Sequence, residues 1–139
     1  MEPVKIGILG LGTVGSGTVN VLTRNADEIQ RRAGRGIRVV SAAARDLKRK
    51  RNCPTEGIRL TADPQEIVND PEVEVVVELM GGYEPARTLV LQAIANGKHV
   101  VTANKAMIAA HGNEIFAAAQ KKGVMVAFEA AVAGGIPII

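Results

Sequence analysis

Three glycines near the amino terminus are spaced so that a phosphate can approach the backbone. Gly10, Gly12 and Gly15 fit the pattern G-x-G-x-x-G. In dinucleotide-binding sites the first glycine permits a tight turn, the second lets a pyrophosphate reach the backbone, and the third lets a helix pack closely on a strand. We therefore expect these glycines to bind a dinucleotide; the alternative is a turn that only packs a helix on a sheet.

The end of the second predicted strand bears on which dinucleotide binds. An acidic residue at this position holds the ribose hydroxyls of NAD, whereas an arginine accepts the extra phosphate of NADP. The chain has Arg45 followed by Asp46. Arg45 favours NADP, and Asp46 leaves NAD open. We expect the basic residues at 48–51 to be individually part of a solvated surface.

Polar residues follow the later predicted strands, at ends that face the same crevice. Lys105 is the main catalytic candidate, because an ammonium beside a nicotinamide can stabilise oxyanion charge or orient the carboxamide and ribose. An exposed lysine at a helix start fits the sequence equally well. We also expect Gly81 and Thr102 to contact the cofactor. The further candidates at these strand ends are Glu78, Met80, Gly82, Asn104 and Glu129.

The hydrophobic pattern predicts the elements that position these residues. Apolar runs predict strands over 4–9, 37–44, 58–60, 73–80, 99–103 and 124–129. Helical spacing between them predicts one helix from the glycine turn to Gly34, a short helix after Asp63, a helix closed by Gly97, and one from Asn113 closed by Gly123. Such alternation predicts an α/β, doubly wound, mostly parallel sheet of three-layer Rossmann type, with the glycine motif between the first strand and first helix.

Composition limits the function classes. A chain of 139 residues with 47% hydrophobic content is predicted to form one domain with its own core. One cysteine excludes an internal disulfide and fits a reducing, cytoplasmic location, and no apolar run has membrane-spanning length. The net charge is only +3, with one Tyr, two Phe and no Trp, so we do not expect a nucleic-acid partner.

Five segments, in this order and spacing, resemble the amino-terminal cofactor domain of homoserine dehydrogenase. They are GILGLGTVGSG, AAARD, VVVELMGG, VTANKAMIA and EAAVAGGIPII. Many dehydrogenases share the first, whereas the fourth and fifth are more specific. The resemblance implies a part of an enzyme that interconverts homoserine and aspartate 4-semialdehyde with NAD(P), on the route to threonine, methionine and isoleucine.

The same resemblance implies roles for individual residues. Thr13 and Val14 would contact the pyrophosphate, Arg45 the adenosine phosphate, and Lys105 the nicotinamide end. The family also binds a monovalent cation, often sodium, through backbone oxygens. The stretch that matches this site in the present chain contains Glu129, Val132, Gly134 and Ile136.

The family's chains continue into a substrate and dimerisation domain, which implies a homo-oligomeric parent protein. We therefore expect the sequence to be a fragment, truncated after Ile139, whose 139 residues bind cofactor and turn over little or no substrate. Two alternatives stay open. One is a free-standing dinucleotide-binding sensor module, and the other is the cofactor domain of another semialdehyde or sugar dehydrogenase.

Overall fold

A six-stranded sheet forms the centre of the protein. The computed structural model describes residues 2–128. The strands are β1 (Val4–Leu9), β2 (Ile37–Ala43), β3 (Arg59–Thr61), β4 (Val75–Glu78), β5 (His99–Thr102) and β6 (Val126–Ala127). Their order is β3-β2-β1-β4-β5-β6, and every described pair is parallel. The predicted doubly wound α/β fold is confirmed.

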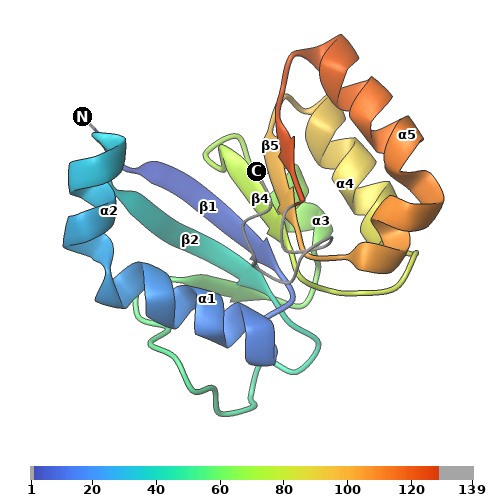
Figure 1. The fold of residues 1–139 in the computed structure, drawn as a ribbon. Coiled ribbons are helices and arrows are strands. Elements are labelled where there is room, and N and C mark those ends of the chain that lie inside the picture. Colours follow the sequence, from blue (N-terminus) through green and yellow to red (C-terminus); the bar gives the residue numbers. More distant parts are fainter. Residues whose placement is uncertain (1, 129–139) are drawn as a thin grey trace.

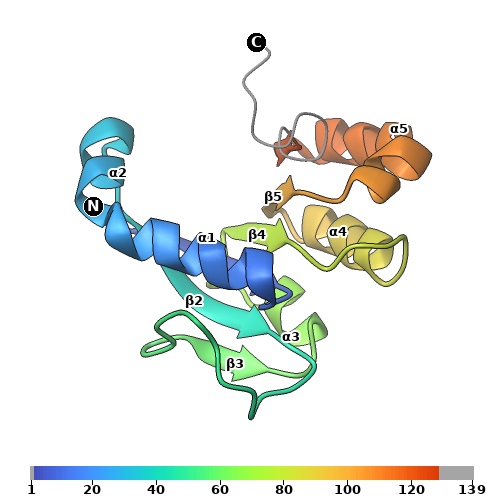
Figure 2. The same ribbon diagram turned by 60° about the horizontal axis from the view of Figure 1, so that its bottom comes forward.

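Helices cover both faces of this sheet (Figures 1 and 2). They are α1 (Thr13–Arg24), α2 (Ala26–Ala33), α3 (Gln65–Val68), α4 (Ala86–Ala95) and α5 (Lys105–Lys122). The neighbouring residues Val76 and Val77 of β4 belong to different hydrophobic clusters, because successive strand side chains point to opposite faces. Val76 packs in a cluster with residues of α3, α4 and α5, and Val77 packs in one with Val19 of α1. The sheet therefore separates two cores.

The first predicted helix is two helices, which corrects the sequence interpretation. Both the backbone N–H and the side-chain Nδ2 of Asn25 donate to the carbonyl of Val21, at 3.0 Å each. Asparagine side chains compete in this way with the regular helical ladder. The following helix, α2, has no buried residue, so no apolar face keeps it in line with α1.

The last helix begins eight residues earlier than the sequence predicts, at Lys105 instead of Asn113. Asn104 precedes it and caps it, since its side-chain oxygen accepts a hydrogen bond from the Met107 N–H at 3.1 Å. Met107 and Ile115 are both fully buried in the core under α4 and α5. Lys105, which follows β5 closely in the chain, therefore lies in the first turn of this helix and not in a loop.

A buried lysine connects the chain at the amino ends of β4 and β5. The Nζ of Lys98 donates to the carbonyl of Asp70 at 2.5 Å and to that of Val73 at 2.7 Å. Burial lowers the pKa of Lys98, and the nearby charge of Asp70 opposes that shift. Lys98 is 5% exposed, so these two carbonyls take the place of the water that its Nζ would otherwise bond.

Replacing this lysine tests the contribution of the two hydrogen bonds. Lys98→Met keeps the length of the side chain but removes the Nζ donor from both carbonyls, of which that of Asp70 keeps its hydrogen bond from the Val73 N–H at 3.1 Å. We expect the free energy of unfolding to fall by about 1–3 kcal/mol, measured by urea unfolding followed by circular dichroism. Lys121→Met, on an exposed position of α5, is the control and should change it by less than about 0.5 kcal/mol. Equal effects of the two variants would contradict the role of Lys98.

Candidate functional site

The three glycines of the first turn have different structural roles. Gly10 has a φ of +102°, and a Cβ there would lie 3.1 Å from the Leu79 carbonyl oxygen. A Cβ on Gly15 would lie 2.2 Å from the Gly10 carbonyl oxygen, closer than atoms can approach. A Cβ on Gly12 would meet nothing within 4 Å. Packing therefore requires the first and third glycines, while the second leaves open space in front of the backbone.

The amino terminus of α1 has no side-chain cap. Gly12 stands at the N-cap position, and the first turn carries no acidic residue. The Ser16 N–H donates to the Gly12 carbonyl at 2.8 Å, so the N–H groups of Thr13, Val14 and Gly15 precede this first helical bond. Thr13 and Val14 are exposed. Free N–H groups and the positive end of the helix dipole favour an anion here.

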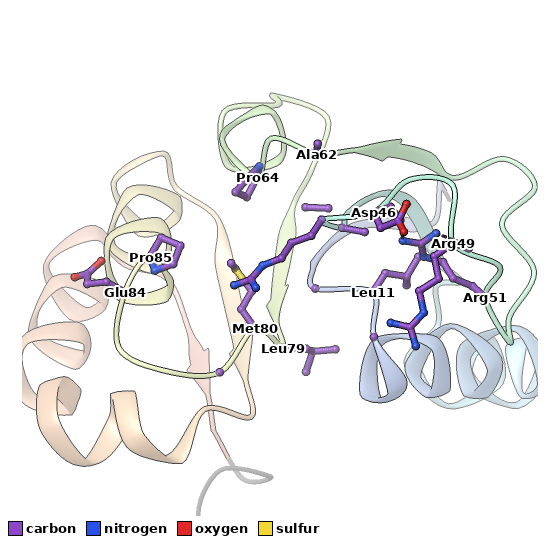
Figure 3. A pocket seen from close by; sticks show the side chains of 16 residues that line it. Leu11, Asp46, Arg49, Arg51, Ala62, Pro64, Leu79, Met80, Glu84 and Pro85 are labelled. Carbon is purple, nitrogen blue, oxygen red and sulfur yellow. Dashed lines mark hydrogen bonds between the residues drawn. The ribbon is translucent and has the colours of Figure 1, made fainter.

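A crevice of about 410 Å³ opens beside this helix end. It lies at the carboxyl ends of β1 and β4, which are neighbours in the sheet although β2 and β3 come between them in the sequence. Ligands of doubly wound sheets bind where the strand order reverses in this way. Met80, Glu84 and Pro85 lie on one side of the crevice, and Asp46, Arg49 and Arg51 on the other (Figure 3).

The basic loop after β2 borders the crevice in a defined shape. Arg51 donates through its guanidinium to the carbonyls of Asp46 and Arg49. The Asn20 side chain donates to the Asn52 carbonyl at 2.7 Å and so ties the loop to α1. Arg45 and Arg49 are exposed and line the crevice. The exposure of Lys48, Arg49 and Lys50 agrees with the predicted solvated surface, but the hydrogen bonds that fold the loop leave no periodic signal in the sequence.

The carboxylate of Asp46 is used within its own loop. Its Oδ1 accepts a hydrogen bond from the Lys48 N–H at 2.9 Å. Asp46 lines the crevice, yet this bond holds one of its two oxygens against the chain. The side of the crevice formed by β2 and the loop that follows it presents Arg45, Arg49 and Arg51 beside this single carboxylate, so it favours an anionic group.

A second group of polar side chains lies at the ends of β4 and β5. Glu78 is fully buried and accepts hydrogen bonds from the Met80 N–H at 2.8 Å, the Gly81 N–H at 3.3 Å and the Thr102 hydroxyl at 2.6 Å. The Thr102 hydroxyl also accepts from the Asn104 N–H at 3.1 Å. Thr102 is 1% exposed, so its side chain supports the site from beneath.

The predicted site residues are only partly gathered in one place. Those that line the crevice are Gly10, Gly12, Arg45 and Gly81. Thr13 borders a smaller hollow of about 210 Å³ that Gly12, Arg49 and Arg51 also line. Lys105 is exposed in the first turn of α5 and is not among the residues that line the crevice.

The predicted cation site lies outside the described residues, since it consists of Glu129, Val132, Gly134 and Ile136. Within residues 2–128, no group of three or more His, Cys, Asp or Glu residues is arranged to hold a metal ion. In the same part of the chain, none of the helices combines the length and apolar character needed to cross a membrane.

Comparisons with known proteins agree with this geometry. A family profile described as "Homoserine dehydrogenase, NAD binding domain" matches residues 10–129. A homoserine dehydrogenase of Pseudomonas aeruginosa is 66% identical over 139 residues, which are 100% of this chain and 32% of that protein. The crystal structure of a homoserine dehydrogenase from Thiobacillus denitrificans superposes with a TM-score of 0.91 at 65% identity, over 99% of this chain and 32% of that one. The chain thus spans about a third of the length of the relatives it matches.

The distinct roles of Gly12 and Gly15 are testable by stability. Gly15→Ala places a methyl group against the Gly10 carbonyl, so we expect the free energy of unfolding to fall by about 1–3 kcal/mol. Gly12→Ala, its matched control, adds the same methyl group in open space and should change that energy by no more than about 0.5 kcal/mol. Urea unfolding measures both. A larger loss for Gly12→Ala than for Gly15→Ala would contradict the assignment.

Glu84, at the crevice rim, provides a pH test. The hydrogen bond from the Thr88 hydroxyl to its carboxylate, at 2.6 Å, is the main cause that lowers the pKa of Glu84 below its usual 4.5. Because the folded pKa is the lower one, the stabilisation is present above pH 4.5 and is lost as the pH falls through the folded pKa.

We expect Glu84→Gln to unfold at lower urea concentration than the wild type at neutral pH, and the difference to shrink as the pH falls below 4.5. Thr88→Val, which removes the main cause, should raise the pKa of Glu84 in an NMR titration. A difference between wild type and Glu84→Gln that grows at low pH would refute this account.

Proposed function

The chain belongs to the homoserine dehydrogenase family, and from this premise we propose that residues 1–139 are the NAD(P)-binding domain of an enzyme that interconverts L-homoserine and L-aspartate 4-semialdehyde. The observation that carries the proposal is the uncapped amino terminus of α1, which faces an open crevice at the reversal of strand order. In the family this reaction serves amino-acid biosynthesis.

The pyrophosphate of the cofactor would bind at the start of α1. The N–H groups of Thr13 and Val14 precede the first helical hydrogen bond, and the open space at Gly12 lets phosphate oxygens come near the backbone. Gly10 and Gly15 bring the helix close enough to β1 for this end to reach the crevice. The donors come from the backbone, so this part of the site does not depend on side-chain identity at Thr13 or Val14.

We further propose that the domain prefers NADP over NAD. Arg45 and Arg49 line the crevice beyond β2, where the adenosine ribose of a dinucleotide bound at α1 would lie. Asp46, the acidic residue that would otherwise accept from ribose hydroxyls, has its Oδ1 engaged by the Lys48 N–H. The extra phosphate of NADP would meet two guanidinium groups, which form strong charge-assisted hydrogen bonds with phosphate.

Lys105 is the proposed catalytic residue of this domain. It lies in the first turn of α5, which follows β5, and β5 lies on the opposite side of β1 from β2, the strand that Arg45 follows. Bound nicotinamide would supply or accept the hydride at the aldehyde carbon of the substrate. The ammonium of Lys105 would orient the nicotinamide end and stabilise negative charge on the substrate oxygen.

Other parts of the proposal concern the whole protein. The small-molecule substrate would bind with the help of chain outside these 139 residues, in a homo-oligomer in the cytoplasm. A sodium ion would be held by backbone oxygens around Glu129, Val132, Gly134 and Ile136, because a hard cation prefers oxygen ligands.

Arg45→Ala tests the cofactor preference. We expect NADPH binding to weaken by about 1.5–3 kcal/mol, because a charge-assisted bond to phosphate is lost. NADH binding should stay nearly unchanged. Nicotinamide fluorescence can report both titrations, since the chain has no tryptophan. Arg38→Ala is the matched control, an exposed arginine near the other end of β2. Equal weakening of both cofactors by Arg45→Ala would refute the proposed role.

A further inference from the structure

The fully buried Glu78 carboxylate links the segment after β4, which lines the crevice, to the end of β5. Its Oε2 accepts from the N–H groups of Met80 and Gly81, and its Oε1 accepts from the hydroxyl of Thr102. Met80 and Gly81 line the crevice, whereas Thr102 ends β5. One side chain therefore fixes the segment after β4 relative to the neighbouring strand.

The link continues into α5. Asn104 donates its own N–H to the Thr102 hydroxyl at 3.1 Å and its side-chain Nδ2 to the Gly82 carbonyl at 2.6 Å. Its side-chain oxygen caps α5 at Met107. The carboxylate, the hydroxyl and the amide thus form one connected network from the crevice lining to the helix that carries Lys105.

The segment held by this network needs support. Gly81 and Gly82 have φ values of +78° and +73°, and a Cβ on either would meet nothing within 4 Å. Two successive exposed glycines have no side chains whose packing could fix the backbone. The hydrogen bonds from Met80 and Gly81 to Glu78, and from Asn104 to Gly82, supply it.

The order of the strands shows which part of a dinucleotide this network serves. β2 lies on one side of β1, and β4 and β5 lie on the other. A dinucleotide with its pyrophosphate on α1 and its adenosine half beside Arg45 must extend its other half over the ends of β4 and β5. That half is the nicotinamide ribose and ring.

We propose that Glu78 is a positioning residue for the nicotinamide half of the cofactor, acting through Thr102 and the backbone of Met80 and Gly81. The proposal rests on the proposed function, because it presumes a dinucleotide in the crevice. Glu78 is buried beneath the segment and touches neither cofactor nor substrate. It holds the surface on which the nicotinamide half lies.

The test compares two ligands on the full 139-residue chain. NADPH carries both halves of the cofactor, and 2′,5′-ADP carries only the phosphorylated adenosine half. Thr102→Val removes the hydroxyl that donates to Glu78 with little change in shape, Thr102→Ser restores a hydroxyl, and Glu78→Gln exchanges one carboxylate oxygen for a donor. Lys98→Met is the matched control, a buried polar side chain that bonds backbone carbonyls at the opposite end of β5.

We expect Thr102→Val and Glu78→Gln to weaken NADPH binding about tenfold, the size of one lost buried hydrogen bond, and to leave 2′,5′-ADP binding within about twofold. At saturation, the fluorescence anisotropy of bound NADPH should fall because the nicotinamide is less well held. Thr102→Ser should restore both readouts. Lys98→Met should lower stability and leave both affinities unchanged.

Three results would overturn the inference while the proposed function survives. They are equal weakening of both ligands in the variants, no weakening of either, and a wild type that binds NADPH no more tightly than 2′,5′-ADP. A wild type that binds neither ligand would instead defeat the proposed function itself, and the inference with it.

Discussion

The contact between Gly15 and the carbonyl of Gly10 determines where the site can exist. A Cβ on Gly15 would lie 2.2 Å from that oxygen, so only glycine lets α1 begin directly at the end of β1. This close packing brings the free N–H groups of the first helical turn to the edge of the sheet where β1 and β4 are neighbours. The crevice, its basic side and its nicotinamide side are all placed relative to that helix end.

The two sides of the crevice are held in different ways. On the side of β2, a loop folds through hydrogen bonds from Arg51 to backbone carbonyls and through the contact of Asn20 with Asn52, which leaves Arg45 and Arg49 to line the opening. On the side of β4 and β5, the buried Glu78 carboxylate organises backbone N–H groups and the Thr102 hydroxyl. Guanidinium groups are thus exposed where a phosphate is proposed to bind, whereas a buried hydrogen-bond network holds the segment over which the nicotinamide half is proposed to lie.

The sheet and the glycine turn could be predicted from sequence because they depend on local patterns. Apolar runs locate the strands, and the glycine spacing locates the turn after Leu9. The break at Asn25 and the early start of α5 depend on single side-chain hydrogen bonds, from Asn25 to Val21 and from Met107 to Asn104. Asparagine is a common cap residue but makes such bonds only in particular geometries, so the sequence pattern alone does not show which asparagines will do so.

Part of the candidate site could be predicted because its residues follow directly from the strand pattern. Strand ends on one edge of a parallel sheet must converge, which placed Gly10, Arg45 and Gly81 around one crevice. The roles of residues that depend on contacts between distant parts of the sequence could not be predicted in this way. Thr102 was expected to touch the cofactor, but its hydroxyl is bonded to Glu78, 24 residues earlier. Its burial depends on how β4 and β5 pair, which the hydrophobic pattern alone does not specify.

The proposed function depends on the free amino terminus of α1 as the site of the cofactor pyrophosphate. The most direct measurement is an NMR titration of the 14.6 kDa chain with NADPH, in which each backbone N–H is followed. We expect the N–H resonances of Thr13, Val14 and Gly15 to move most and to saturate together. Saturation with shifts confined to other elements, such as α2 or the outer face of α5, would contradict it.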